Sequence, residues 1–250
     1  MSKSPAVHRH LVYQVGTIRS LLNGVYEGDL SFHELAHYGD FGLGTFDAVN
    51  GEMIALDGEC FRIDADGRAH RVDPDMKSPF AVMTRFQATD AFPITDPLDF
   101  EGLKGRIAAR LESRNIIHAV RVAGEFAHID ARSEHPQPDG HRPLRETIAQ
   151  VQTQLSFTDI RGTMVGFWFP QHMKAINVPG FHFHFLGEDR ATGGHVFDLK
   201  LRDVKVEVMA VFDFGMHLLH TPLFAHADLA TESDDATHQV EQAPGNPNPS

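Results

Sequence analysis

The chain has 250 residues, a formal net charge of −12, and 42% hydrophobic and 22% charged residues. This length suits one large domain or two closely packed ones, and the composition is ordinary for a soluble globular protein. The acidic balance argues against nucleic acid and membrane surfaces as partners, because both require a basic face, but a small anionic substrate remains compatible with one local cationic site. No apolar run approaches the roughly 20 residues of a membrane span. With Cys60 as the single cysteine, no internal disulfide is possible, and the expected location is the cytoplasm.

The first half of the chain predicts strands mixed with short helices. Apolar patterning favours a strand in residues 10–22, a short helix in 30–39, and strands in 80–86 and 115–129. Residues 42–72 read as a meander, since short apolar runs alternate with three Asn-Gly or Asp-Gly turn dipeptides. Residues 99–113 read as a helix that Asp99 caps.

The second half predicts a sheet that follows a loop rich in Pro, His and Arg. The loop is expected at residues 132–143, and strand-like segments follow at 158–170, 180–186 and 195–214. We therefore predict a mixed α+β fold of two packed, mixed or antiparallel β-sheets with few helices. The expected division is an N-terminal α/β domain, a C-terminal metal-binding β-rich domain and a disordered tail, at 1–131, 132–242 and 243–250.

The alternation in "GFHFHFL" is the strongest chemical signal. A strand places successive side chains on opposite faces, so the phenylalanines share one face while His182 and His184 share the other. If this segment pairs with "HVFDL" across the loop 187–194, His195 lies opposite or diagonal to His184, with Cβ atoms about 5 to 7 Å apart. Three convergent imidazoles with an open position are typical of a catalytic zinc site.

A cupin-like metal enzyme, such as a dioxygenase or an isomerase, is one alternative. In that pattern a Glu ligand follows His-x-His, and Glu188 lies four residues after His184. However, Ile176 occupies the place of the glycine that the pattern requires, and Glu188 sits in a charged loop sequence. The cupin interpretation therefore fits the histidines but not their surroundings.

Several segments in order resemble another family. "GLGTFDAVNGEMIALDGECFRI", "ARSEHPQPDGHRPL" and "GTMVGFWFP", followed by "GFHFHFLGEDRATGGHV", resemble the acetolactate decarboxylase family from about Val12 to Glu241. The resemblance implies a zinc enzyme that converts 2-acetolactate to acetoin and carbon dioxide. It also implies His182, His184 and His195 as the zinc ligands, which the strand geometry selects independently.

The other functional positions of that family match one at a time. The glutamate of its "LDGE" segment matches Glu52, the threonine of its "GTF" matches Thr45, and the arginine of its "RS…Q…PL" loop matches Arg132. That loop departs from the family at 140–141, where Gly-His replaces the usual Pro-Tyr, and a glutamate near the C-terminus matches Glu241 in "HQVEQ". Without the resemblance, each of the four residues reads as an ordinary turn, strand, surface or tail residue.

The resemblance implies a role for each of these positions. Arg132 would bind the substrate carboxylate or the developing oxyanion, because a guanidinium offers paired donors and stays charged, and Thr45 would be a second substrate-binding residue. Glu52 would protonate the enediolate that remains after CO2 is lost, with Glu241 as its partner or as the donor. A homodimer is the assembly that the resemblance implies.

A non-enzymatic module is the second alternative. The histidine hairpin also resembles the PPC domain, an assembly or DNA-associated module of prokaryotes and plants. The chain carries no Arg-Gly-Arg-Pro hook and is acidic, so a nucleic-acid role has little support.

Overall fold

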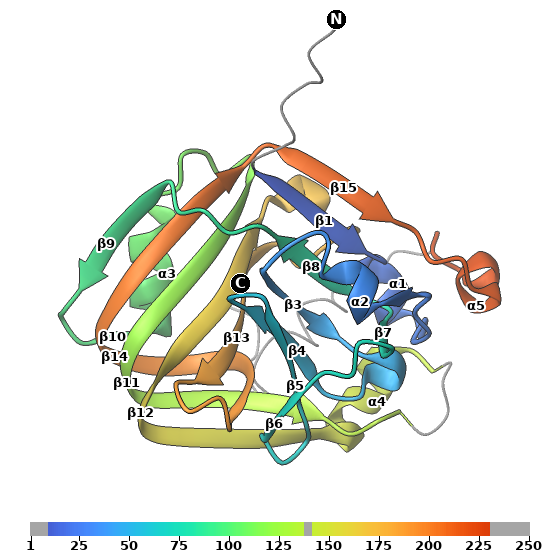
Figure 1. Ribbon diagram of the computed structural model, residues 1–250, viewed down its shortest axis with the longest axis horizontal. Coiled ribbons are helices and arrows are strands. Elements are labelled where there is room, and N and C mark those ends of the chain that lie inside the picture. Colours follow the sequence, from blue (N-terminus) through green and yellow to red (C-terminus); the bar gives the residue numbers. More distant parts are fainter. Residues whose placement is uncertain (1–9, 138–141, 231–250) are drawn as a thin grey trace, which may run out of the picture.

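Two β-sheets pack against each other and carry the short helices at their edges and outer faces (Figure 1). The computed structural model describes residues 10–137 and 142–230. The mixed α+β class and the two packed sheets predicted from the sequence are confirmed. In the described part of the chain, no helix has the length and apolar character needed to cross a membrane.

The first sheet has seven strands in the order β15-β1-β8-β3-β4-β5-β6. The strands are β15 (Asp213–His217), β1 (Leu11–Val15), β8 (Ala81–Thr84), β3 (Phe41–Thr45), β4 (Glu52–Leu56), β5 (Glu59–Ile63) and β6 (Ala69–Arg71). The predicted meander is confirmed, since β3, β4, β5 and β6 pair antiparallel with their neighbours. Asp57 and Gly58 connect β4 to β5 with φ angles of 54° and 81°, which is the backbone of a tight hairpin turn.

The second sheet has the order β10-β14-β11-β12-β13, with β9 also on β14. The strands are β9 (Asp90–Ile94), β10 (Leu98–Asp99), β11 (Ile117–Glu134), β12 (Gln152–Phe169), β13 (Gly180–Gly187) and β14 (Gly193–Val211). Because β13 pairs with both β12 and β14, the four longest strands form a closed circuit of pairings. Figure 1 shows β11 and β12 bending so that their paired ends reach α4, and β11 shifts register against β14 between Asp130 and Ala131.

The remaining elements are short. They are α1 (Ile18–Leu22), β2 (Leu30–Ser31), α2 (Phe32–Leu35), η1 (Asp47–Val49), β7 (Lys77–Ser78), α3 (Phe100–Ala108), α4 (Leu144–Val151), η2 (Gln171–Met173) and α5 (Pro222–His226). The predicted cap of α3 is confirmed, because the Asp99 side chain accepts a hydrogen bond of 2.8 Å from the backbone N–H of Gly102.

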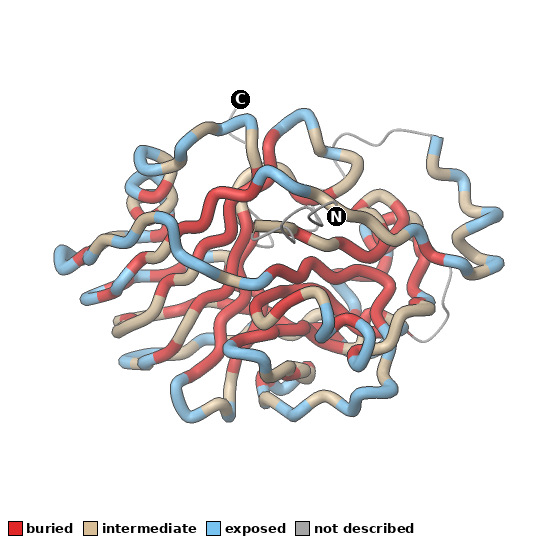
Figure 2. The backbone as a smooth tube through the Cα atoms, turned by 45° about the horizontal axis from the view of Figure 1, so that its top comes forward, coloured by how far each residue is buried: buried red, intermediate tan, exposed pale blue. Residues whose placement is uncertain are grey.

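One hydrophobic core joins the two sheets, and a second lies on the outer face of the second sheet. The first contains Ile54 and Val82 of one sheet together with Val165 and Met209 of the other. The second packs α3 against the sheet. Figure 2 shows the buried backbone concentrated through the middle of the molecule. Burial of each large apolar side chain contributes about 1.5–3 kcal/mol, so the shared core holds the sheets in one arrangement.

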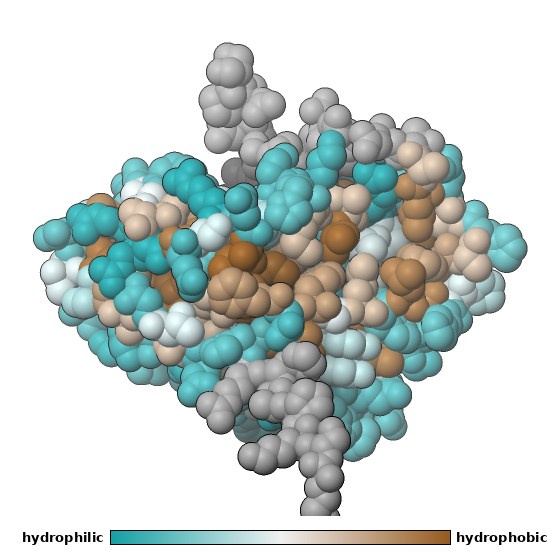
Figure 3. All heavy atoms as spheres, turned by 90° about the horizontal axis from the view of Figure 1, so that it is seen from above, coloured by the Kyte–Doolittle hydropathy of each residue, from teal (hydrophilic) through white to brown (hydrophobic). Residues whose placement is uncertain are grey.

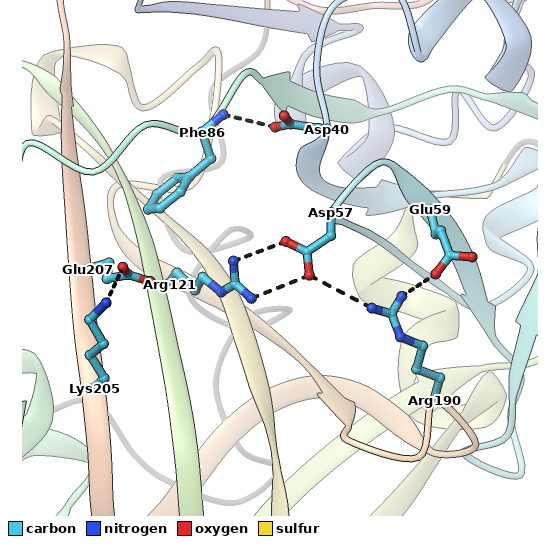
Figure 4. A network of polar contacts seen from close by, with 8 residues as sticks. All are labelled: Asp40, Asp57, Glu59, Phe86, Arg121, Arg190, Lys205 and Glu207. Carbon is cyan, nitrogen blue, oxygen red and sulfur yellow. Dashed lines mark hydrogen bonds and ion pairs between the residues drawn. The ribbon is translucent and has the colours of Figure 1, made fainter.

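Ion pairs also connect the sheets near the β4–β5 turn (Figure 4). Arg121 of β11 donates to Asp57 over 3.0 Å, and Arg190 of the β13–β14 hairpin donates to Glu59 over 2.5 Å. Arg190 lies 3.8 Å from Asp57 as well. These four residues, Asp57, Glu59, Arg121 and Arg190, are called the surface network below.

The surface carries both hydrophilic and apolar side chains. Figure 3 shows hydrophilic side chains around the rim of one face and a band of apolar side chains across its middle. Among the described residues, the large apolar side chains classed as exposed are Phe212 and Leu218.

Three local expectations are wrong. The strand predicted for residues 10–22 ends at Val15, because Gly16 has a φ of 63° and Thr17 caps α1 by accepting from the backbone N–H of Ser20. The helix predicted for 30–39 is limited to α2. The loop predicted from Arg132 begins later, since β11 continues to Glu134, and the helix α4 that follows the loop was not predicted.

Strand pairing also crosses the expected domain boundary. A division after residue 131 would cut β11, and β9, β10 and most of β11 join the second sheet although they precede that boundary. In the other direction, β15 returns to the first sheet and pairs parallel with β1. The division into two domains stays a prediction, but its sequence limits do not coincide with the two sheets.

Candidate metal centre

The hairpin of β13 and β14 brings three histidines together. His184 lies opposite His195 in the antiparallel pairing, which confirms the predicted register. His182, His184 and His195 are 7%, 1% and 4% exposed. The phenylalanines of the alternation face the second core, where Phe183 and Phe185 are fully buried. A side chain at Gly193 would meet the carbonyl oxygen of Phe185 at 2.3 Å, so this close return of the strand requires glycine.

The spacing of the imidazole nitrogens fits a metal ion. Nε2 of His182 lies 3.1 Å from Nε2 of His184 and 3.1 Å from Nδ1 of His195. One ligand atom of each residue lies within 4.8 Å of the others. Nitrogens bound to one tetrahedral zinc at about 2.0–2.1 Å would lie about 3.3 Å apart. The three histidines therefore present the donor set and the spacing of a three-histidine metal site.

The tautomer of His184 also suits metal binding. Its Nδ1 lies 2.9 Å from the carbonyl oxygen of Met53, which can only accept, so Nδ1 carries the proton and Nε2 keeps its lone pair. Burial, together with the Arg132 charge, lowers the pKa of His182 to about 3. Burial and the neighbouring His182 hold the pKa of His184 well below its ordinary value. Both rings are thus neutral at physiological pH, as metal ligands must be.

Glu52 reaches this cluster from the other sheet. It is the first residue of β4, it is buried, and its Oε2 lies 3.2 Å from Nε2 of His184. Its Oε1 lies 3.8 Å from Nδ1 of His195. Because the lone pair of His184 faces this carboxyl group, the contact is favourable only with a proton or a cation between the two atoms. Glu52 is therefore placed either to share a metal ion or to hold a proton beside it.

Thr45 supports the backbone next to Glu52. It lies opposite Glu52 in the β3–β4 pairing, and its hydroxyl donates to the carbonyl oxygen of Gly51 over 2.8 Å. Gly51 has a φ of 88°, which is the left-handed region that favours glycine. This contact holds the turn from which Glu52 enters the cavity.

Arg132 enters from β11 and lies opposite His195 in the β11–β14 pairing. Its side chain is buried, and its Nε lies 3.5 Å from Oε1 of the buried Glu134. Glu134 was not identified from the sequence, because residues 132–143 were read as a loop. Read as a strand, "RSE" places residues 132 and 134 on the same face, so strand periodicity was the signal that could have found it.

All these side chains line one small cavity of about 40 Å³. Its polar wall is formed by Thr45, Glu52, Arg132, Glu134, His182, His184 and His195. Its apolar wall includes Ile18 and Leu21 of α1 and Leu144 and Ile148 of α4. Such a site combines an anion receptor, carboxyl groups and neutral imidazoles next to a surface suited to alkyl groups.

Two other sequence candidates lie elsewhere. Glu188, the ligand expected from the cupin interpretation, has a side chain that is 68% exposed and pairs with Arg161 over 3.3 Å. It is not among the described residues that line the cavity or form the histidine cluster, so the cupin ligand set is wrong. Glu241 lies outside the described residues.

Comparison with known proteins gives the family. A profile of the family described as alpha-acetolactate decarboxylase matches residues 12–231. The chain belongs to this family. It is 41% identical over 232 residues to an alpha-acetolactate decarboxylase of Methylococcus capsulatus, with 93% of this chain and 89% of the relative covered. The corresponding Bacillus subtilis protein is 37% identical over 236 residues, with 94% and 91% covered.

Solved structures of the family have the same fold. The crystal structure of alpha-acetolactate decarboxylase from Bacillus subtilis strain 168 aligns with a TM-score of 0.90 at 36% identity, covering 93% of this chain and all of that one. A Staphylococcus aureus protein described as similar to the enzyme aligns with a TM-score of 0.86 at 30% identity, covering 92% and 98%. The family resemblance noted from the sequence is therefore confirmed.

Proposed function

We propose that this protein is a zinc-dependent acetolactate decarboxylase that converts (S)-2-acetolactate to (R)-acetoin and CO2. The observation that carries the proposal is the buried cluster of three imidazoles beside Arg132 and Glu52, in a chain of this family. When bound, zinc supplies a Lewis acid that accepts electron density at the substrate's ketone oxygen. His182, His184 and His195 would hold it.

Arg132 receives the substrate carboxylate in this proposal. The substrate is an anion, and the guanidinium is a buried cation in the cavity wall, where its charge is screened little. The bond from the carboxylate carbon then breaks, its electron pair flows into the neighbouring ketone, and CO2 leaves. An enediolate remains. Thr45 contributes by holding the Gly51 turn beside the substrate.

Glu52 delivers the proton that completes acetoin. It is buried and faces the cavity from the sheet opposite the histidine hairpin, so it approaches the enediolate from one side. Protonation from a single face would give a single enantiomer. The apolar wall from α1 and α4 packs against the methyl groups and excludes water, which protects the enediolate from unselective protonation.

Glu241 remains a proposed partner of Glu52 in proton delivery. Truncation after Gln242 is expected to leave activity unchanged, whereas truncation before Glu241 should lower it while the protein stays folded. Equal activity of the two truncated proteins would remove Glu241 from the mechanism. The homodimer and the cytoplasmic location also stay predictions from the sequence.

The test is acetoin formation from acetolactate by the purified protein. Activity should fall on exhaustive chelation, return on addition of zinc, and yield one acetoin enantiomer on a chiral column. Elemental analysis before and after chelation gives the metal content separately from activity. A fully metal-loaded, folded protein that forms no acetoin would contradict the proposal.

A further inference from the structure

Glu134 places a buried negative charge in the same cavity as the proposed carboxylate receptor. It lies two residues after Arg132 on β11, and the two side chains share one face of that strand. The ion pair joins Nε of Arg132 to Oε1 of Glu134 over 3.5 Å, and both side chains are 4% exposed. An anion that binds Arg132 from the cavity therefore meets this carboxylate as well.

Glu134 lies between the buried cation of Arg132 and an apolar part of the cavity wall. The cavity wall beyond the polar groups is apolar, with Ile18 and Leu21 of α1 and Leu144 and Ile148 of α4. Removing one member of a buried ion pair leaves the other charge uncompensated, so Glu134 stabilises the buried guanidinium of Arg132 in the folded protein. The same compensation acts on any anion that binds Arg132 from the cavity.

The proposed reaction gives the Glu134 carboxylate a second role. Decarboxylation removes the negative charge from the carboxylate as CO2 leaves, so an ion pair to Arg132 stabilises the bound substrate more than the transition state. Binding energy of that kind lowers KM but also slows the chemical step. Arg132 is 3% exposed, so water screens its charge little in the cavity. A carboxylate at the Nε edge offsets part of that charge.

We propose that Glu134 is a positioning residue that limits how tightly Arg132 holds the substrate carboxylate. This inference rests on the proposed function, because it takes Arg132 as the carboxylate receptor. Glu134 acts through the guanidinium and does not exchange a proton in the reaction. Its removal should therefore strengthen the binding of anions in the cavity and leave neutral ligands unaffected.

Calorimetric binding of two unreactive ligands to the zinc-loaded protein tests this. 2-Hydroxy-2-methylpropanoate carries the hydroxyl and the carboxylate but no ketone, whereas acetoin carries the hydroxyl and the ketone but no carboxylate. Glu134→Gln should raise the affinity for the carboxylate ligand about threefold to tenfold and change that for acetoin less than about twofold. Glu101→Gln is the matched control, since it removes the same charge from a side chain that is 82% exposed on α3, and it should change neither affinity.

The competing outcomes are distinct. An unchanged or weaker affinity for the carboxylate ligand, or an equal shift for both ligands, would overturn the role of Glu134. Glu134→Val repeats the test if the Gln variant melts at a much lower temperature. With acetolactate, Glu134→Gln should lower KM and kcat together, and a raised KM would contradict the inference. A wild-type protein without turnover contradicts the proposed function, while the two binding measurements still decide whether Glu134 weakens anion binding.

Discussion

Two polar clusters bridge the same pair of sheets with opposite exposure. The candidate metal centre joins Glu52 of β4 to the histidines of β13 and β14, and the surface network joins the β4–β5 turn to β11 and the β13–β14 hairpin. The metal-centre side chains are buried, whereas Arg121 and Asp57 of the surface network are 27% and 50% exposed. The same residue types thus occur in two different dielectric environments.

This difference sets what each cluster can contribute. In the surface network, water and salt screen the charges, so each pair is worth about 0–1 kcal/mol. In the metal centre, the charges are hardly screened, and burial shifts the pKa values of His182 and His184 far enough to keep their rings neutral. Substitutions in the metal centre should therefore affect function, whereas substitutions in the surface network should only slightly affect stability.

The largest effect is expected from the histidines. His182→Ala, His184→Ala or His195→Ala should each remove most of the bound zinc and nearly all activity, because each deletes one of three converging nitrogens. Metal content by elemental analysis and acetoin formation check this. Stoichiometric zinc in all three variants would contradict the ligand assignment.

Glu52→Gln should have the next largest effect. The amide keeps the size of the side chain but cannot act as an acid, so kcat should fall about 100-fold or more while the fold is retained. Chiral analysis of the acetoin should show reduced enantiomeric purity. If both rate and purity survive, Glu52 is a structural residue of the β3–β4 turn.

Arg132→Lys should lower kcat/KM by about tenfold to 100-fold and leave zinc content unchanged. Lysine keeps the charge but not the planar pair of donors that matches a carboxylate. Steady-state kinetics and elemental analysis of the same preparation check the two parts. Near-normal kinetics for Arg132→Ala would mean that another group receives the carboxylate.

The smallest effect is expected from Asp57→Asn in the surface network. Asn tolerates the positive φ of Asp57 and removes only the charge, so the free energy of unfolding should fall by about 0–1 kcal/mol, and by less at high salt. Urea unfolding at two salt concentrations measures this, with kcat as the control that should not change. A loss above about 2 kcal/mol would mean that the network is effectively buried.

Local sequence periodicity was sufficient to predict the side of the metal centre that the β13–β14 hairpin forms. The alternation in residues 181–185 assigned the faces of β13, and "GGH" marked the close return of β14, so the pairing of His184 with His195 was predicted correctly. Both sequence patterns lie within the 16 residues from Gly180 to His195, and a short hairpin allows few registers. The capped helix α3 and the meander of the first sheet were found for the same reason.

The opposite side of the centre depends on contacts between distant parts of the chain. No local pattern brings Glu52 to His184, and on its own sequence Glu52 reads as a turn residue at the surface; only the family resemblance pointed to it. Glu134 was missed because Pro, His and Arg in the following residues concealed the end of β11. The parallel return of β15 to β1 was missed because Leu11 and its partner Asp213 lie 202 positions apart in the sequence. Periodicity is a property of a few neighbouring residues, whereas the packing of two sheets is decided by the sum of many weak side-chain contacts across the shared core. The sequence by itself therefore determined the strand faces and the histidine hairpin, and the tertiary structure decided which carboxylates and which arginine those histidines face.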